Sequence, residues 1–392
     1  MLSLSDLEHD PHAGLARLRA QSPVAWVPVL DGWLVTGYTE AVAVMRDSRT
    51  FTVDDPRFST ARVVGPSMLS LDGRAHSRHR SPFFAAFHRG DAAQRLPAFA
   101  EAEASRLVAA IRPAGSADLR RELSGPLAVA VVAEALGLGH ISPAEILALY
   151  SRIVGGVTSL SADQGEPGPQ DTTGIGQPDP GSVAAFNELA GLLRAVIEAP
   201  GAADRSVLGA AAAAGQLSPD EIISDAAVVM FGGIDTTDGM IANAALHLLS
   251  QPDQLELVRS DPALLPAAVE ESLRLEPAAA IVDRYATGDA ELAGAKIRAG
   301  DRVTVSITGA NRDPAVFGDP DQFDLNRPES GRHLAFAHGP HFCIGAPPAR
   351  AETLAALRAL LPLPGLRLDP ERPASPEGLV FRKPPTLDVL WD

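Results

Sequence analysis

Apolar residues at helical spacing dominate this chain, and the longest such run extends from Ile222 to Leu249. Ser218 precedes the run as an N-cap residue, and Glu221 follows it at the spacing of a capping box. Shorter helices are predicted over residues 98–111, 123–138, 143–154 and 264–275. Strand patterns cover residues 24–29, 32–36, 296–298 and 302–307, and a final hairpin over 379–389 that turns at Pro384-Pro385. The pattern predicts a mainly α fold with a small β region and no alternating βαβ units.

One stretch interrupts this helical texture. Residues 161–181 contain Gly, Pro, Gln, Asp and Thr, and almost nothing apolar. Their composition predicts a long polar loop between two helices. Two interpretations stay open: a surface insertion and a lid over a binding site. The total of 392 residues allows one large domain or two or three smaller ones.

The charge balance excludes one class of partner. The net charge is −16, from 33 Lys and Arg against 49 Asp and Glu, and nucleic acid prefers a basic surface. The N-terminus lacks the basic start and apolar run of a signal peptide. The longest apolar stretches, 127–133 and 226–234, are far shorter than the ~20 residues that span a bilayer. We therefore expect a cytoplasmic protein that binds neither nucleic acid nor membranes.

The chain has a single cysteine, Cys343, which excludes an internal disulfide and a cysteine-built zinc site. It lies in a loop, residues 336–345, directly before an Ala/Leu-rich helix. Backbone N–H groups and the positive end of that helix would stabilise a thiolate. Gly339 and Gly345 would let the backbone pass close to a flat group. Such a thiolate can be the axial ligand of haem iron, although a lone cysteine is more often an inert buried residue.

The run from Phe336 to Gly345 resembles the haem-binding signature of the cytochrome P450 family, Phe-x-x-Gly-x-x-x-Cys-x-Gly. The resemblance covers the chain from about Val24 to its end. It implies the cytochrome P450 fold in a single haem domain over residues 1–392, with haem b held by the Cys343 thiolate. It also implies a monooxygenase that uses O2. Because the haem domain takes up the whole length, electrons would come from a separate ferredoxin and ferredoxin reductase.

A second motif lies in the long apolar helix, where residues 231–239 read Phe-Gly-Gly-Ile-Asp-Thr-Thr-Asp-Gly. Each glycine weakens a helix by ~1 kcal/mol, and Thr236 competes for the local carbonyls, so we expect a kink. The run resembles the family's oxygen-binding motif, with Gly232 at the cofactor. By that resemblance, Asp235 would feed protons from solvent and Thr236 would hydrogen-bond the oxygen at the iron.

Four basic residues resemble the family's contacts to the haem propionates. His76 and Arg80 are four residues apart, so one helix face can present both to one anionic group. Arg284 follows an apolar run, and His341 lies two residues before the cysteine. With Phe336 and Gly345 of the signature, they complete the expected cofactor-binding set.

Glu271 and Arg274 match the family's Glu-x-x-Arg pair, and a downstream loop offers Arg327. The resemblance implies that these three residues form a structural triad behind the haem. We expect them to be a scaffold and not catalysts, since a buried set of charges is costly to break.

The residues expected to meet substrate are small or apolar and imply a pocket with few polar anchors: Val228, Val229, Ala279, Ala280, Ile281, Leu379 and Val380. Arg57 and Arg62 would either bind a substrate carboxylate or face solvent. A local basic island, made of Arg74, Arg78, Arg80 and Arg89, would suit an acidic ferredoxin or be ordinary surface charge.

These features favour a haem-thiolate monooxygenase that inserts one oxygen atom of O2 into a small to medium, largely apolar organic substrate of secondary metabolism. Two alternatives stay open. One is a family member with an unusual oxidative outcome, such as coupling, nitration or peroxide-driven oxidation. The other is a non-catalytic haem-binding protein. The presence of Asp235 and Thr236 favours O2 activation over peroxide use, and their loss would have supported the non-catalytic alternative.

Overall fold

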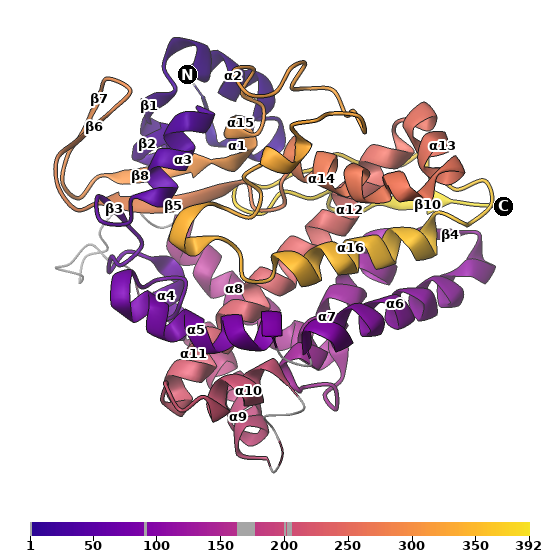
Figure 1. Cartoon of the computed structure of the whole chain (residues 1–392), viewed down its shortest axis with the longest axis horizontal. Helices are drawn as coiled ribbons and strands as arrows, with labels where there is room; N and C mark the ends of the chain where they lie inside the picture. Colours follow the sequence, from indigo (N-terminus) through magenta and orange to yellow (C-terminus); the bar gives the residue numbers. More distant parts are fainter. Residues whose placement is uncertain (1, 90–91, 163–176, 200, 202–205) are drawn as a thin grey trace. The chain divides into compact units, whose positions relative to one another are not determined.

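The computed structural model describes residues 2–89, 92–162, 177–199, 201 and 206–392 (Figure 1). The chain divides into two compact units by its internal contacts. The first unit comprises Met1–Thr52, Pro97–Ala128 and Asp235–Asp392, and the second comprises Val53–Leu96 and Val129–Ile234. The single haem domain over residues 1–392 stays a prediction.

The first unit contains a five-stranded sheet in the order β1-β2-β8-β5-β3. Its strands are β1 (Val24–Val27), β2 (Gly32–Val35), β3 (Phe51–Thr52), β5 (Ile281–Ala286) and β8 (Arg302–Ser306). The predicted hairpin of β1 and β2 is confirmed, with Asp31 in the left-handed region at φ 44°. β2 pairs in parallel with β8, and apolar residues of these strands pack with α3 (Tyr38–Arg46) into one core cluster.

Besides α3, the described part of the first unit contains eight helices or parts of helices, together with the start of α7 (Gly125–Leu136). The eight are α1 (Leu4–His9), α2 (His12–Gln21), the larger part of α6 (Ala92–Ile111), α12 (Asp235–Leu249), α13 (Pro252–Ser260), α14 (Leu265–Leu275), α15 (Ile307–Ala310) and α16 (Ala346–Leu360). A π-helical turn covers Arg120–Ser124. Residues 237–246 of α12 are all buried, and the helix packs against α14 and α16 (Figure 1). This burial explains why apolar residues occur on every side of the helix, and why its buried polar side chains, such as Asp238 and Asn243, have hydrogen-bond partners.

The predicted final hairpin over residues 379–389 is wrong. β10 (Asp388–Leu390) instead pairs with β4 (Ser116–Asp118) and β9 (Arg367–Leu368). Pro384 and Pro385 have no N–H to donate to a ladder, and their carbonyls accept hydrogen bonds from Arg120. The strand predicted at 296–298 is β7 (Ala295–Ile297), which pairs with β6 (Ala290–Leu292) in a separate ribbon.

The described part of the second unit is helical. It holds α4 (Ser59–Val64), α5 (Gly73–Arg89), α8 (Pro143–Ala162), α9 (Pro180–Glu198), α10 (Val207–Ala213) and α11 (Pro219–Gly233), together with the end of α7 (Gly125–Leu136). α8 runs to Ala162 and α9 starts at Pro180, so both ends of the predicted 161–181 loop are helical. Residues 163–176 of that loop lie outside the described residues. In the described ranges, no helix is long and apolar enough to cross a membrane.

Candidate active site

The loop that carries Cys343 is a tight turn of defined geometry. The backbone N–H of Cys343 donates to the carbonyl of Phe336 at 2.9 Å, and this bond closes the loop. Ala337 (φ 58°) and Gly339 (φ 73°) both lie in the left-handed region. A Cβ at Gly339 would lie 2.6 Å from the carbonyl oxygen of Met45, so only glycine fits there. The thiol that emerges is half-buried, and the neighbouring Phe342 is 45% exposed.

A partly buried ion cluster packs against Phe336 of this loop. The Arg350 guanidinium lies over the Phe336 ring at 4.4 Å and donates to Glu270 at 2.6 and 2.8 Å. His333 is also 3.2 Å from Glu270. Burial would raise the pKa of Glu270, but the bonds from Arg350 and His333 outweigh it and bring the pKa to about 2. Nothing in the local pattern around Glu270 predicted this role.

Glu271, Arg274 and Arg327 come together as one buried network. Arg274 donates to both carboxylate oxygens of Glu271 at 2.7 Å, and Arg327 donates to one of them at 2.9 Å. The arginines also donate to backbone carbonyls between Asn311 and Gln322, including that of Gly318. The triad therefore fastens the loop after α15 to α14, as a scaffold would.

The predicted long helix is two helices. α11 ends at Gly233, Ile234 lies between, and α12 begins at Asp235, which agrees with the expected kink. The N-terminal capping box of Ser218 and Glu221 is confirmed. A Cβ at Gly233 would lie 2.4 Å from Val132 Cγ2, whereas one at Gly232 would meet no atom within 4 Å. The first glycine thus faces open space, and the second allows close packing.

Asp235 and Asp238, one helical turn apart on α12, share a single cation that sequence reasoning missed. Lys383 Nζ lies 2.5 Å from Asp235 Oδ1 and 2.8 Å from Asp238 Oδ2. Asp238 also accepts from Arg120 and from Ser124, both at 2.6 Å. Burial would raise the pKa of Asp238, but Lys383 and Arg120 outweigh it and keep that pKa below its usual value.

The expected propionate contacts divide between the two units. His76 is buried and Arg80 half-buried on α5 of the second unit. Arg284 is buried in β5 of the first unit and donates to the carbonyl of Asp283 at 2.7 Å. His341 is half-buried in the short turn before the cysteine, and Gly345 directly precedes α16. Their common role at the haem stays a proposal.

The expected substrate residues also lie in both units. Val228 and Val229 are half-buried on α11 in the second unit. In the first unit, Ala279 to Ile281 lie beside residues 379–381, with Val380 39% exposed. Leu379 packs against an apolar cluster of Leu7, Leu15, Val27, Leu30 and Leu34. Of Leu379 and Val380, Val380 is the more exposed, and the contact of all these residues with substrate stays a prediction.

Comparison with known proteins identifies the chain. The cytochrome P450 family model matches residues 203–389. The monooxygenase PikC of Streptomyces venezuelae is 34% identical over 98% of this chain and 90% of its own length. The chain belongs to the cytochrome P450 family. Nocardicin C N-oxygenase of Nocardia uniformis subsp. tsuyamanensis is also 34% identical, over 97% of this P450 and 96% of the relative.

Solved structures support the fold of this P450. The crystal structure of HmtN, a post-tailoring hydroxylase involved in himastatin biosynthesis, superposes with a TM-score of 0.79 at 28% identity and covers all of both chains. The mainly α P450 fold with its small β region is thus confirmed. The enzyme is a monooxygenase, and therefore an oxidoreductase that acts with O2 on a small molecule.

Haem fits the residues around Cys343. P450 enzymes hold haem b through a cysteine thiolate, and this chain has only one cysteine. The thiol of Cys343 is half-buried, Phe342 beside it is exposed, and the backbone N–H of Cys343 is bonded within the loop to Phe336, so Cys343 would hold the haem iron next to an apolar surface. Bound haem supplies the activation of O2, and Cys343 is its ligand.

Proposed function

We propose that this P450 inserts one oxygen atom of O2 into a small to medium, largely apolar organic substrate of secondary metabolism. The observation that carries the proposal is an apolar strip in the first unit. The amide of Ala280 donates to the carbonyl of Val380 at 2.9 Å, and Ala279 forms a bridge with Phe381. Residues 278–282 and 379–381 include no charged side chain, and Val380 is 39% exposed. Such a surface favours apolar ligands.

The described contacts argue against a carboxylate anchor at Arg57. Its guanidinium already donates to both oxygens of Asp55, at 2.8 and 2.9 Å. A substrate carboxylate would have to displace this bidentate pair. The relatives support a biosynthetic role, because an N-oxygenase named for nocardicin C and a post-tailoring hydroxylase are among them.

The residues of the chain divide the work as follows. Arg284 and His341, with His76 and Arg80, would neutralise the two haem carboxylates, since unpaired buried charges are costly. Thr236 would hold a proton near the reacting oxygen, and Asp235 would supply it from the solvent side. The triad of Glu271, Arg274 and Arg327 would keep the haem-facing loops in place.

Three ligands, two uncharged and one acidic, test the substrate class. The purified holoenzyme is titrated with 2-ethylnaphthalene, testosterone and the acid 2-naphthoate, and the haem spin shift is recorded. We expect the two uncharged probes to bind at least tenfold more tightly than the acid, because the strip offers no cation. Val380→Glu should weaken both uncharged probes. Tighter binding of 2-naphthoate would overturn the apolar-substrate proposal.

We also propose a separate ferredoxin and ferredoxin reductase as the electron source. Arg74 and Arg78 are exposed on α5, while the intervening His76 is buried, so one face of this helix is basic. Arg78 forms an ion pair with Glu221 at 2.5 Å, which partly neutralises its charge. Substitution of Arg74 is therefore the better test of ferredoxin docking. Arg74→Glu should slow reduction by an acidic ferredoxin and weaken its salt dependence.

The control is Arg259→Glu, an equal charge change at an exposed position of α13. Reduction by dithionite should stay unchanged in both variants. Equal ferredoxin rates for Arg74→Glu and Arg259→Glu would remove the α5 face as the docking surface.

A further inference from the structure

The chain has only two lysines, Lys296 and Lys383, among 33 basic residues. Lys296 is exposed on the β6–β7 ribbon. Lys383 is only 13% exposed and lies between two carboxylates. The other basic residues in that total are all arginines, so a partly buried lysine at position 383 is unusual in this sequence.

The contacts of Lys383 use its whole donor capacity. An ammonium group has three N–H donors. Here the acceptors are Asp235 Oδ1 at 2.5 Å, Asp238 Oδ2 at 2.8 Å and the backbone oxygen of Asp235 at 3.3 Å. A compact point charge satisfies such converging acceptors, whereas the planar fork of arginine prefers a single carboxylate. The ammonium therefore fixes both the side chain of Asp235 and the first turn of α12.

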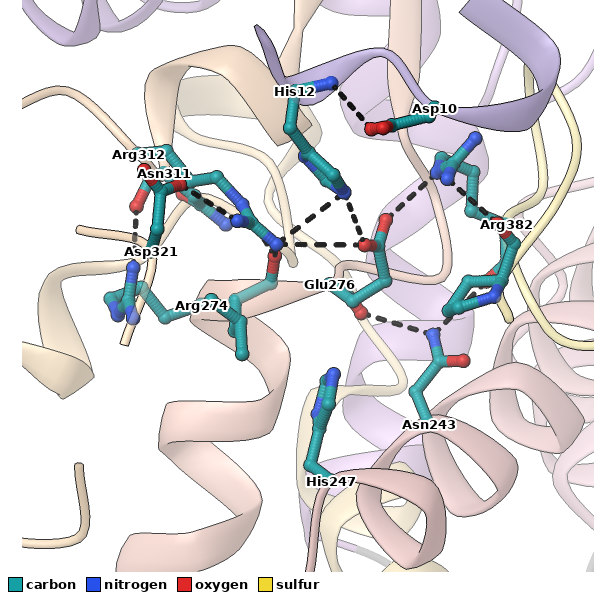
Figure 2. Close-up of polar contacts among 12 residues, drawn as sticks. Asp10, His12, Asn243, His247, Arg274, Glu276, Asn311, Arg312, Asp321 and Arg382 are labelled. Carbon is teal, nitrogen blue, oxygen red and sulfur yellow. Dashed lines mark hydrogen bonds and ion pairs between the residues drawn. The ribbon is translucent and has the colours of Figure 1, made fainter. Parts of the chain in front are cut away.

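The residue before Lys383 is anchored just as firmly (Figure 2). Arg382 is 2% exposed, and its Nε donates to Glu276 at 2.8 Å. Its other nitrogens donate to backbone oxygens of α1 and of the C-terminal segment, with Glu8 at 2.9 Å and Pro376 at 2.8 Å. His12 lies 2.9 Å from Glu276 on the other side. Because Arg382 is held by these contacts, the cluster fixes the position along α12 at which the next residue, Lys383, contacts the helix.

We propose that Lys383 is a positioning residue for proton delivery, which acts by holding the Asp235 carboxylate in place. The inference rests on the proposed role of Asp235 as the proton source for Thr236. Lys383 reaches solvent only slightly and contacts Asp235 directly. Its removal releases the Asp235 carboxylate without changing the helix sequence, whereas Asp238 keeps its bonds from Arg120 and Ser124. The Glu276–Arg382 cluster extends this control to α1 and α2.

The first measurement does not depend on turnover. Holoenzyme labelled with 15N at the lysine side chains gives two ammonium signals, recorded on the CO-bound ferrous form because that form is diamagnetic. We expect slow hydrogen exchange at Lys383 and fast exchange at Lys296. Asp235→Asn should move the Lys383 signal only. Equal exchange rates at both lysines, or a Lys383 signal that Asp235→Asn does not move, would show that Lys383 does not hold the Asp235 carboxylate.

The second measurement is O2 consumption by substrate-free holoenzyme with NADH and a surrogate reductase pair, in H2O and D2O. Lys383→Met should slow it on the order of tenfold and enlarge the solvent isotope effect, because a misplaced acid delivers protons more slowly. Lys383→Arg should recover part of the rate. Lys296→Met, the matched control, should match wild type.

The Asp235→Asn variant distinguishes a failure of the Lys383 proposal from a failure of the proposed role of Asp235. If Asp235→Asn is slow and Lys383→Met is normal, the positioning role of Lys383 is wrong while the role of Asp235 stands. If Asp235→Asn itself consumes O2 at the wild-type rate and isotope effect, the proposed proton source is wrong, and Lys383 has no proton delivery to position.

Discussion

Asn243 fastens two distant chain segments to α12 with one side-chain amide. Its Nδ2 donates to the backbone oxygen of Arg382 at 3.0 Å and to that of Glu276 at 3.1 Å. One turn earlier, a Cβ at Gly239 would lie 2.8 Å from Ala278 Cβ and 3.5 Å from the Arg382 oxygen. The C-terminal segment thus packs directly on the helix that carries Asp235 and Thr236, and its stability bears on their placement.

The Glu276 cluster should be a large contributor to stability. Burial would raise the pKa of Glu276, but His12, Arg382 and Arg312 outweigh it and bring that pKa to about 2. Glu276→Ala leaves Arg382 buried without its counter-charge, so we expect the free energy of unfolding to fall by ~3–5 kcal/mol. Urea denaturation followed by circular dichroism measures this. The control Glu101→Ala, which breaks an exposed pair with Arg358, should cost less than ~1 kcal/mol.

His247 should make the protein sensitive to mild acid. Burial lowers its pKa to about 4 from the usual 6.5, although Glu276 opposes the shift, and its Nδ1 pairs with Ser272 Oγ at 2.9 Å. The unfolded chain therefore binds the proton more readily, so stability is complete above pH 6.5 and is lost as the pH falls toward 4. His247→Gln should flatten the unfolding free energy across that window, by on the order of 1–3 kcal/mol. An unchanged pH slope in the variant would contradict this assignment.

Replacing Cys343 should change the haem spectrum qualitatively. The family's red-shifted Soret band of the reduced CO complex comes from the thiolate ligand. Cys343→His should therefore give an ordinary carbonyl-haem band, with the far-ultraviolet circular dichroism of the wild type. A variant that keeps the red-shifted band would remove Cys343 as the ligand.

Thr236→Ala should uncouple reductant use from oxygenation. Without the hydroxyl to hold a proton, O2 should leave as peroxide, so the peroxide formed per NADH should rise several-fold. Thr237, the next residue, is buried in α12 and offers a matched control. Peroxide assays on Thr236→Ala and Thr237→Ala should differ sharply, and similar values would refute a specific role for Thr236.

Local patterns in the sequence predicted the elements whose causes are local. The Ser218–Glu221 capping box and the β1–β2 hairpin depend on residues a few positions apart, and both form as expected. The 336–345 loop and the Glu271–Arg274 pair were recognised by their resemblance to P450 motifs. The i, i+3 spacing of Glu271 and Arg274 alone is common on helices and would not have predicted their buried ion pair.

The contacts of the C-terminal segment could not be predicted from local sequence patterns. Its contacts join Arg382 to Glu8 and Lys383 to Asp235, and no periodicity reports pairings over such separations. Residues 379–389 place apolar residues on both sides of two prolines, which favours a hairpin in the sequence. The prolines have no N–H to donate, and Arg382 is held by Glu276, so this hairpin does not form. The rarity of lysine was the one available signal for the site at Lys383.

The same rarity has a practical consequence. Lys383 is engaged by two carboxylates, so the exposed side-chain amine among the chain's two lysines is that of Lys296, on the β6–β7 ribbon. An amine-reactive linker aimed at side chains should therefore attach each molecule to an electrode or dye through that one ribbon. Orientation on a surface, which usually requires engineered tags, is already encoded in this chain by its near-exclusive use of arginine.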